Sequence, residues 1–421
     1  MRISIIGTGY VGLVTGACFA KLGHHVICVD IDPDKVQKIN KGVSPIYEEG
    51  LENLLLTYKE RITATTDYQD ALEHSDVTFL CVGTPSLKNG SIDISYLKEA
   101  TKQIATILKN KKSWHLVVVK STVVPGTTQQ IVFPLLEQHT GKKIGTDIGL
   151  AMNPEFLKEG VAIQDFLQPD RIVIGFTDEK SRTTLRELYK TFTCPIVETS
   201  LSAAEMIKYA SNAFLATKIS FINEIGNLCK NLGIDTYEVA TGMGLDSRIG
   251  RSFLDSGIGW GGSCFPKDID ALIAWAKEIK EPARIIESVK EVNTDQPLRL
   301  VKILQKHLPK VKGRTIGILG LAFKPDTDDI RESRAIPIVK ELLKQGATIK
   351  AYDPQAMDNF KTLYPTIEYC KKASDVLSSD AILIITKWKE FTTLDFQGTI
   401  VIDGRKLDQA KKAKIYEGVC W

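Results

Sequence analysis

The sequence predicts an α/β protein in which two doubly wound parallel-sheet domains are joined by a central all-helical segment with one long helix. Three observations support this prediction. Short Val/Ile-rich runs alternate with amphipathic segments over the first 195 or so residues, a long run of helical periodicity follows Ser200, and a second alternating run begins at Arg314. Such alternation is typical of a parallel sheet covered by helices on both faces. We place the domain boundaries at 1–198, 199–298 and 299–421.

The first alternating run contains a series of short apolar strands. They are RISIIG (2–7), HVICVD (25–30), DVTFLCVG (76–83), LVVVKS (116–121), IGLAMN (148–153) and RIVIGF (171–176). Amphipathic stretches between them predict helices at 11–22, 34–41, 95–110 and 127–139. Each strand and helix together form one unit of a doubly wound sheet.

The middle of the chain is predicted to be helical throughout. Ser202-Ala203-Ala204-Glu205 has the form of a capping box, and helical periodicity then continues to about Leu232. Further helical patterns cover 235–241, 267–280 and 283–295.

The last part of the chain repeats the organisation of the first. After the basic connector 310–313, the segments RTIGILG (314–320) and TIKAYDP (348–354) parallel 2–7 and 25–33 at similar spacing. The glycine signature described below is complete only in the first run, so only the first domain is expected to use it.

Composition excludes several classes of protein. The 54 basic and 51 acidic residues leave a net charge of +3, too small for the broad positive field that nucleic-acid or anionic-membrane binding requires. No apolar run approaches the roughly 20 residues of a membrane span. The chain opens directly into a strand, without a cleavable apolar leader, so we expect a cytoplasmic protein. The eight cysteines are scattered singly, which argues against disulfides and against a zinc or other metal site.

A glycine fingerprint marks a cofactor site. Gly7-x-Gly9-x-x-Gly12 follows a strand and opens a helix, which is the setting in which a dinucleotide pyrophosphate binds at a helix N-terminus. Asp30 ends the next strand, where a carboxylate binds ribose hydroxyls and repels a 2′-phosphate, so NAD is favoured over NADP. The alternative is a glycine turn in another α/β protein. Lys35 either reaches the adenosine side or lies on a solvated helix face.

Two threonines follow the next two strands. Thr84 lies in CVGTP and Thr122 in KSTVVPG, both at the carboxyl ends of strands, where ligands bind in open parallel sheets. Each is either a ligand contact or a turn residue.

Gly259 to Asp268, GWGGSCFPKD, is the segment richest in chemical signals. Pro266 is a plausible first helical residue, so Cys264 is expected just before a helix N-terminus and beside Lys267, where dipole and charge both favour thiolate. Most lone cysteines are small buried hydrophobes, and we accept that reading for the other seven. The polar neighbours of Cys264 instead favour a nucleophile.

No histidine lies in these motifs, so other groups must assist. Lys208 and Asn212 are four residues apart on one helix face and can donate to an oxyanion. The alternative is that Lys208 pairs with Glu205 on a solvated face. Glu155 and Glu159 follow another strand and suit acid/base work or sugar binding, unless they are ordinary first-turn glutamates of a helix. NAD and a nucleophilic cysteine together indicate oxidation through a thiohemiacetal and a thioester.

Motifs over nearly the whole chain resemble the UDP-glucose 6-dehydrogenases of the UDP-glucose/GDP-mannose dehydrogenase family. They are GTGYVGLVTGACFAKLGHHVICVDID, CVGTP, KSTVVPGT, NPEFLKEG, NAFLATKISFINE, GGSCFPKD, GLAFKPDTDDIRESRAI and the tripeptide DGR at 403–405. The resemblance implies a four-electron oxidation of UDP-glucose to UDP-glucuronate with two NAD+. Serine before Cys264 favours this branch over the dehydrogenases of UDP-N-acetylhexosamines, which usually carry histidine there.

The resemblance also implies residue roles. Cys264 is the nucleophile, Lys208 and Asn212 steady oxyanions, Asp268 and Thr122 position water, and Glu155 and Glu159 assist proton transfer. The implied cofactor contacts are Gly7, Gly9, Tyr10, Val11, Gly12, Asp30, Lys35, Thr84, Thr122, Glu159, Lys267 and Arg331. The implied substrate contacts are Glu155, Phe156, Leu157, Lys158, Glu159, Lys208, Asn212, Arg248, Phe253, Leu254, Asp255, Ser256, Gly257, Gly261, Lys324 and Arg405.

Further implications concern assembly and alternatives. Arg248 resembles an arginine donated by a neighbouring subunit, so a homodimer is expected. Lys324, Arg331 and Arg405 are alternatively surface charges. Trp260 departs from the Phe or Tyr that is more usual in the family. Two other functions stay open: an alcohol dehydrogenase that stops at the aldehyde, and a non-enzymatic NAD-sensing module.

Overall fold

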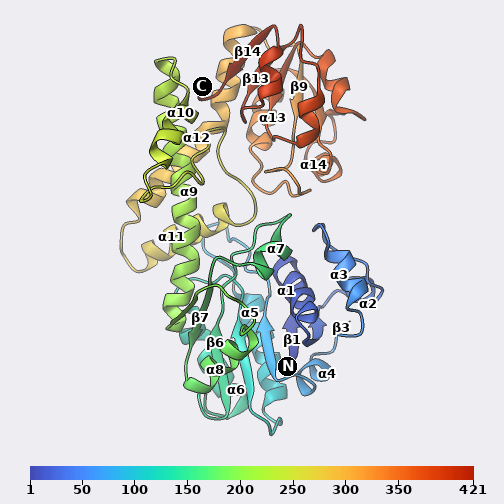
Figure 1. The fold of residues 1–421 in the computed structure, drawn as a ribbon, viewed down its shortest axis with the longest axis vertical. Coiled ribbons are helices and arrows are strands. Elements are labelled where there is room, and N and C mark those ends of the chain that lie inside the picture. Colours follow the sequence, from blue (N-terminus) through green and yellow to red (C-terminus); the bar gives the residue numbers. More distant parts are fainter. The chain divides into compact units, whose positions relative to one another are not determined.

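The protein is described here by a computed structural model of residues 1–421. The chain divides into two compact units, residues 1–210 and 211–421. The helix α9 (Leu201–Asn231) begins in the first unit and continues into the second (Figure 1).

The first unit is built on an eight-stranded sheet in the order β3-β2-β1-β4-β5-β6-β7-β8. Its strands are β1 (Arg2–Ile6), β2 (His25–Val29), β3 (Ile62–Thr65), β4 (Val77–Leu80), β5 (His115–Val119), β6 (Ile148–Met152), β7 (Ile172–Phe176) and β8 (Ile196–Thr199). Neighbouring strands run parallel except β6 and β7, which pair antiparallel. The strand order reverses between β1 and β4, and ligands bind beyond the carboxyl ends of strands at such a point.

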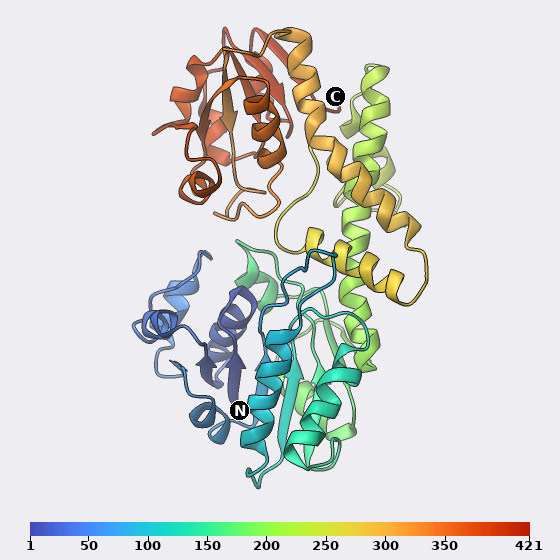
Figure 2. The same ribbon diagram turned by 180° about the vertical axis from the view of Figure 1, so that it is seen from behind.

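Helices cover this sheet. They are α1 (Tyr10–Lys21), α2 (Pro33–Asn40), α3 (Leu51–Thr57), α4 (Tyr68–Glu73), α5 (Ser95–Leu108), η1 (Thr128–Val132), α6 (Phe133–Thr140), α7 (Ala162–Leu167) and α8 (Glu179–Leu188). Figure 2 shows α5, in cyan, alongside α6. All residues of β4, β5 and β6 are buried, as expected for parallel strands with both faces covered.

The middle of the chain is helical, as predicted. After α9 come α10 (Thr236–Gly244), α11 (Phe265–Glu278) and α12 (Arg284–His307). The predicted capping box is wrong, because α9 begins at Leu201 and it is the Ser200 hydroxyl that accepts a hydrogen bond from the Ala203 amide at 3.3 Å. The Glu205 carboxylate instead accepts from the backbone amides of Gly126 and Thr128 at 2.6 and 2.8 Å.

The second unit contains a six-stranded, fully parallel sheet in the order β11-β10-β9-β12-β13-β14. Its strands are β9 (Thr315–Leu319), β10 (Thr348–Tyr352), β11 (Glu368–Tyr369), β12 (Ala381–Ile384), β13 (Ile400–Asp403) and β14 (Ile415–Gly418). Helical elements between them are α13 (Ala335–Lys344), α14 (Met357–Leu363), η2 (Ala373–Ser378), η3 (Lys389–Thr393) and η4 (Asp408–Lys412). The strand order repeats that of the first six strands of unit one, so the predicted second doubly wound domain is confirmed.

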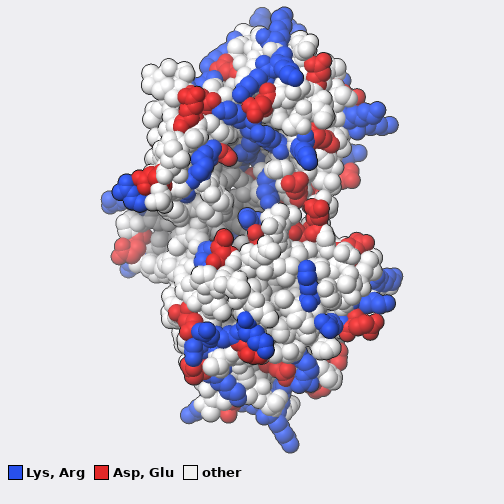
Figure 3. All heavy atoms as spheres, viewed as in Figure 1, with Lys and Arg blue, Asp and Glu red and all other residues white.

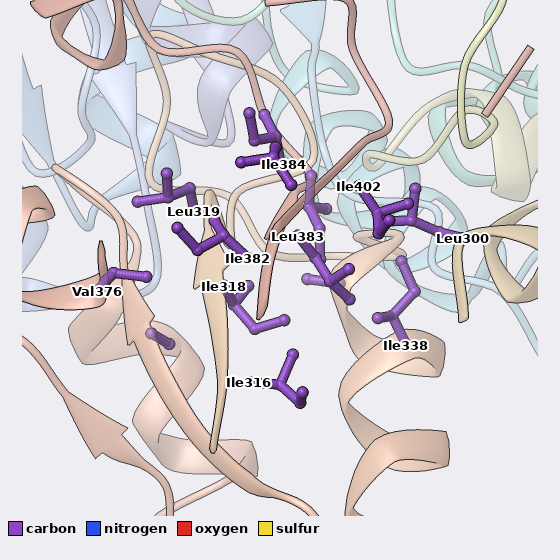
Figure 4. Packing of buried hydrophobic residues seen from close by; sticks show 14 of the residues in the cluster. Leu300, Ile316, Ile318, Leu319, Ile338, Val376, Ile382, Leu383, Ile384 and Ile402 are labelled. Carbon is purple, nitrogen blue, oxygen red and sulfur yellow. The ribbon is translucent and has the colours of Figure 1, made fainter. Parts of the chain in front are cut away.

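Branched aliphatic side chains form the core of this second sheet. Ile316 and Ile318 of β9, Ile382 and Ile384 of β12 and Ile402 of β13 are buried in one cluster (Figure 4). Leu300 of α12 and Ile338 of α13 pack against the same cluster, so both helices are attached to the sheet.

The outer surface is charged but mixed in sign. On the face in Figure 3, basic and acidic side chains are interspersed. No helix combines the length and the apolarity of a membrane-spanning segment.

Candidate functional site

The glycine fingerprint forms a tight turn between β1 and α1. Gly7 has φ +96°, and a Cβ on Gly12 would come within 1.9 Å of the Gly7 carbonyl oxygen, so a side chain at Gly12 would require the turn to open. Gly9 is the N-cap of α1 and faces open space, with no atom within 4 Å of an added Cβ. Gly9 has no side chain with which to cap the helix, so the first-turn amides are available to an anion such as pyrophosphate. The neighbouring Val11 is half-buried.

Asp30 lies at the end of β2 beside this turn. Its carboxylate accepts hydrogen bonds from the Thr8 amide at 2.9 Å, from the Thr8 hydroxyl, and from the Asp32 amide at 3.0 Å. Burial opposes ionisation of Asp30, but these hydrogen bonds and the charge of the half-buried Lys35 outweigh it and lower the pKa of Asp30. Asp30 is therefore an oriented anion, as ribose recognition requires.

Thr84 and Thr122 lie together at the carboxyl ends of β4 and β5. The Thr84 hydroxyl donates to the Thr122 carbonyl at 2.9 Å, and Thr84 is buried whereas Thr122 is half-buried. The structure thus joins the two threonine loops that were singled out separately.

A second carboxylate near the fingerprint was missed by sequence reasoning. Glu48 is 6% exposed and accepts hydrogen bonds from the Tyr10 hydroxyl, from the Gly160 amide at 2.6 Å and from the Ala162 amide at 2.6 Å. The side chain therefore links the fingerprint residue Tyr10 to the loop before α7. Nothing local in the sequence indicates it, because Tyr10 is 38 residues away and both amides that bind it are more than 100 residues away.

The segment after β6 is a loop, and two alternatives considered from the sequence are wrong. Residues 153–158 have no helical structure, so Glu155 and Glu159 are not first-turn glutamates. Lys208 does not pair with Glu205; its Nζ lies 2.7 Å from Glu155 Oε1, and both side chains are at most 5% exposed.

This buried pair keeps Glu155 ionised. Burial alone would raise its pKa, but the Lys208 ammonium and the Leu157 amide, which donates to Oε2 at 2.6 Å, outweigh burial and lower it. Two cations lie over the Phe156 ring. Lys208 Nζ is 5.6 Å from the ring centroid, and the guanidinium carbon of Arg171 is 3.9 Å from it. Leu157 and Glu159 are half-buried, whereas Lys158 is exposed and pairs with Asp165.

Lys120 was also missed as a candidate, although it directly follows β5, at the strand end where ligands bind. Its ammonium is 3.0 Å from Asn153 Oδ1, which also accepts from the Tyr189 hydroxyl at 2.6 Å. Burial lowers the pKa of Lys120 to about 8, opposed by the charge of Glu155. Lys120, Asn153 and Glu155 line one cavity of about 290 Å³ in the first unit.

In the second unit, Cys264 is the N-cap residue of α11 and is half-buried. The helix begins at Phe265, so Pro266 is its second residue and not its first. The Ser263 hydroxyl lies 3.6 Å from the Cys264 sulfur. The thiol thus occupies the helix N-terminus that sequence reasoning assigned to it, where the helix dipole favours thiolate.

Asp268 lies one turn into the same helix. Its carboxylate is 2% exposed and receives hydrogen bonds from Lys267 Nζ and Asn212 Nδ2, each at 2.6 Å. The structure therefore brings the predicted residues Asn212, Lys267 and Asp268 together. The Lys267 ammonium forms an ion pair with Asp268.

Close backbone packing holds the glycine loop before Cys264. A Cβ on Gly261 would lie 2.1 Å from the Glu332 carbonyl, and one on Gly262, at φ +87°, would lie 2.6 Å from the Phe323 ring. Trp260 is 6% exposed, and its indole N–H donates to the Ser220 hydroxyl at 3.0 Å. A phenylalanine at this position has no donor for this hydrogen bond.

A cavity of about 490 Å³ lies within the second unit. Three cations line it: Lys324 from the loop after β9, and Lys387 and Arg405 from the loops after β12 and β13. Arg405 is held by the carbonyls of Ile385 at 2.9 Å and Gly259 at 3.2 Å. Burial lowers the pKa of Arg405 to about 10. Lys387 was not predicted.

The predicted substrate loop forms another part of this cavity wall. Phe253, Asp255, Ser256 and Gly261 line the cavity, whereas Leu254 is buried in a small core. Gly257 is fixed by the Asn223 and Gln296 side chains, which bond its amide and carbonyl at 2.7 Å each.

The two other predicted arginines do not line this cavity. The Arg248 side chain is 87% exposed and pairs with Asp246 at 2.6 Å. Arg331 is exposed and pairs with Asp329 at 2.7 Å.

Comparison with known proteins covers the whole chain. Residues 1–193, 202–295 and 317–409 match the NAD binding, central and UDP binding domains of the UDP-glucose/GDP-mannose dehydrogenase family.

Individual proteins of known name are also similar. The chain is 46% identical to the UDP-glucose 6-dehydrogenase AglM of Haloferax volcanii, over 100% of both chains. It is 45% identical to the UDP-glucose 6-dehydrogenase YwqF of Bacillus subtilis, over 99% of this chain and 96% of the other. A solved UDP-glucose dehydrogenase structure from Pyrobaculum islandicum superposes with a TM-score of 0.96 at 42% identity, covering 100% of this chain and 97% of that one.

Proposed function

Because the chain belongs to the UDP-glucose/GDP-mannose dehydrogenase family, we propose that it oxidises the C6 hydroxyl of UDP-glucose to the carboxylate of UDP-glucuronate, with Cys264 as a covalent nucleophile. The cofactor is NAD. The observation that carries the proposal is the position of Cys264 at the N-terminus of α11, one turn from the Lys267, Asp268 and Asn212 cluster.

The reaction balances with two molecules of NAD+ and one of water. The alcohol loses a hydride and a proton to become an aldehyde, and the Cys264 thiolate adds to its carbon to form a thiohemiacetal. Loss of a second hydride gives a thioester. Water then cleaves the carbon–sulfur bond, which releases the carboxylate and returns the thiol. The products are UDP-glucuronate, two NADH and three protons.

Residues of both units are assigned to the sulfur chemistry. The Asp268 carboxylate is an acceptor held by two donors, and we assign it, with Thr122, to orienting the hydrolytic water. Asn212 and Lys208 are amide and ammonium donors for an oxyanion on C6. Glu155 and Glu159 are assigned to proton transfer and to the sugar.

The first unit fits NAD. Bound there, NAD+ supplies the hydride acceptor. Gly7, Gly9 and Gly12 would admit the pyrophosphate to the N-terminus of α1, while Asp30 would accept hydrogen bonds from the ribose hydroxyls. Tyr10, Val11, Lys35, Thr84, Lys267 and Arg331 complete the assigned contacts.

The second unit fits the uridine diphosphate part of the substrate. Lys324 and Arg405 in the 490 Å³ cavity suit a diphosphate, and the loop 253–257 and Gly261 form the remaining wall. Phe156, Leu157 and Lys158 are assigned to the sugar side. We keep the three-part division 1–198, 199–298 and 299–421 as the functional one.

Replacement of Cys264 tests the covalent chemistry. In Cys264→Ser we expect kcat to fall by roughly three orders of magnitude or more, because an alcohol is a poor nucleophile and a poor leaving group. UDP-glucose binding, measured calorimetrically, should persist. Full turnover in this variant would exclude the thioester route.

The NADH yield separates the proposed enzyme from the alternatives. Two NADH per UDP-glucose are expected; one NADH indicates an alcohol dehydrogenase that stops at the aldehyde, and none indicates a binding module. A panel of UDP-glucose, UDP-galactose and two UDP-N-acetylhexosamines, read by NADH absorbance, tests the substrate.

We further propose a homodimer. Phe214, Phe221 and Leu228 recur at seven-residue spacing on α9 and are 65%, 46% and 61% exposed, and Ile285 of α12 is 72% exposed. A second copy of the chain is the partner that the exposed Arg248 would serve.

We also propose that the protein is cytoplasmic. Its eight free cysteines suit a reducing compartment.

A further inference from the structure

The segment after β14 packs behind one wall of the cationic cavity in the second unit. One residue of this wall is Tyr237, the second residue of α10. Tyr237 lines the cavity, and its hydroxyl donates a hydrogen bond to the Ser256 carbonyl at 3.1 Å. Ser256 belongs to the predicted substrate loop. Tyr237 therefore connects α10 to that loop by a hydrogen bond inside the wall.

The Tyr237 ring is itself held from outside the cavity. The Trp421 ring meets it edge-on, with centroids 5.5 Å apart and planes at 89°. Lys406 Nζ lies 4.0 Å from the Tyr237 centroid and 5.8 Å from the Trp421 centroid, and it pairs with Asp235, the N-cap of α10. Trp421 does not line the cavity, so it can act on a ligand only through its neighbours, of which Tyr237 is one.

Trp421 is also linked to a second residue of the cavity, Arg405. Its indole N–H donates to the Tyr416 hydroxyl at 2.8 Å, and Tyr416 donates to Asp403 Oδ2 at 3.0 Å. Asp403 also accepts from the backbone amide of Arg405 at 2.8 Å. Hydrogen bonds and ring contacts thus run from the cavity residue Arg405, through Asp403, Tyr416 and Trp421, to Tyr237.

We propose that Trp421 is a positioning residue for the sugar-nucleotide cavity, which it shapes by fixing Tyr237 relative to Arg405. This inference rests on the proposed function, since the ligand is taken to be the UDP part of UDP-glucose. Removal of the indole takes away the ring packed against Tyr237, and the substrate loop joined to Tyr237 through Ser256 loses a fixed support. The expected effect is on sugar-nucleotide binding and not on NAD+.

Trp421→Ala and Trp421→Phe provide the test in the full-length protein. In Trp421→Ala we expect the KM for UDP-glucose to rise roughly three- to tenfold, the size of one aromatic pair, while the KM for NAD+ stays unchanged. Trp421→Phe keeps a ring against Tyr237 but loses the hydrogen bond to Tyr416, so it should restore part of the affinity and lie between wild type and Trp421→Ala. Binding of UDP alone, measured calorimetrically, should weaken by the same factor.

Several outcomes would overturn the proposal. One is an unchanged KM for UDP-glucose in Trp421→Ala. Another is an equal rise in both KM values with a lower melting temperature and no rescue by Trp421→Phe, which would indicate a general structural role. Absence of wild-type turnover would count against the proposed function alone, because UDP binding by the two variants would still decide the role of Trp421.

Discussion

Glu155 and Lys208 form an ion pair that is almost entirely removed from solvent, with side-chain exposures of 5% and 4%. A buried pair of this kind contributes little net stability compared with apolar residues, because both ions lose their hydration. Removal of one partner is costly, since the other charge stays buried without compensation. An apolar contact would stabilise the fold equally well, so stability does not explain why two charges are buried here. We therefore attribute the pair to function.

Replacing Glu155 by glutamine tests this reasoning. We expect Glu155→Gln to lower the free energy of unfolding of the first unit by roughly 3–5 kcal/mol at pH 7 and to lower kcat as well. Urea unfolding followed by circular dichroism measures the first quantity. Glu187→Gln on α8 is the matched control, because it breaks the solvent-exposed ion pair of Glu187 with Lys190 and should leave stability nearly unchanged.

The pH dependence of that difference has a defined sign. The folded pKa of Glu155 lies below its ordinary value, so its contribution is complete above pH 5 and disappears as pH falls through the folded pKa. The stability gap between wild type and Glu155→Gln should therefore be constant from pH 5 to 8 and shrink below about pH 4. A gap that stays constant at low pH would show that its origin is not the carboxylate charge.

The sequence predicted well the residues whose chemistry depends on local setting. Gly7, Gly12 and Cys264 lie where their motifs placed them, because a turn or a helix N-terminus is encoded within a few residues. Glu48 was missed because its partners at Gly160 and Ala162 are brought to it only by the fold.

Helices and strands show the same division between local and long-range information. The long helix was predicted close to its observed bounds, Leu201–Asn231, from helical periodicity, although the capping box that was predicted at its start does not form. The role given to Glu205 was wrong, because this buried carboxylate accepts from the amides of Gly126 and Thr128 near the start of η1, in a distant segment. The antiparallel pairing of β6 and β7 was also not predicted, since apolar runs do not encode strand direction.

The loop before α7 depends on Glu48 for its backbone hydrogen bonds. We expect Glu48→Gln to destabilise the first unit by about 1–3 kcal/mol, because an amide accepts the Gly160, Ala162 and Tyr10 donors less strongly than a carboxylate. Hydrogen exchange read by mass spectrometry should show faster exchange over 158–163 than in wild type.

Tyr10→Phe is the paired control for this loop. It removes a donor to Glu48 and one of the two acceptors of the Gly160 amide, but it leaves the carboxylate with both amides. Exchange over 158–163 should therefore change less than in Glu48→Gln. Equal acceleration in both variants would place the support in the Tyr10 hydroxyl and not in the Glu48 charge.

The two sheets share one strand order but not one glycine signature. In the second unit the turn after β9 has Gly320 at φ +95°, and the Leu321 and Ala322 amides are bonded to Asp353 at 2.7 and 3.0 Å. The carboxylate at the end of β10 thus occupies amides in this turn, much as Asp30 binds the Thr8 amide in the first unit. In the first unit Gly9 leaves the start of α1 open, so the same architecture is suited to a dinucleotide in one copy only.

The exposed stripe on α9 predicts that the protein is a dimer in solution. Phe214, Phe221 and Leu228 are spaced so that they lie on one helix face, and Phe221 and Ile285 border the same groove of about 310 Å³ between α9 and α12. Apolar side chains of this size, gathered in one patch, mark an interaction surface, whereas scattered ones do not.

Phe221→Glu should weaken this association. A buried charge at the centre of the patch would cost about 2 kcal/mol or more per interface, which corresponds to at least a roughly 30-fold rise in the dimer Kd. Sedimentation velocity over a concentration series measures it, and Leu363→Glu on α14, an apolar residue outside the stripe that is 51% exposed, is the control. If Arg248 acts in the partner's site, the monomeric variant loses turnover while UDP still binds. Unchanged sedimentation of Phe221→Glu would show that α9 does not form the interface.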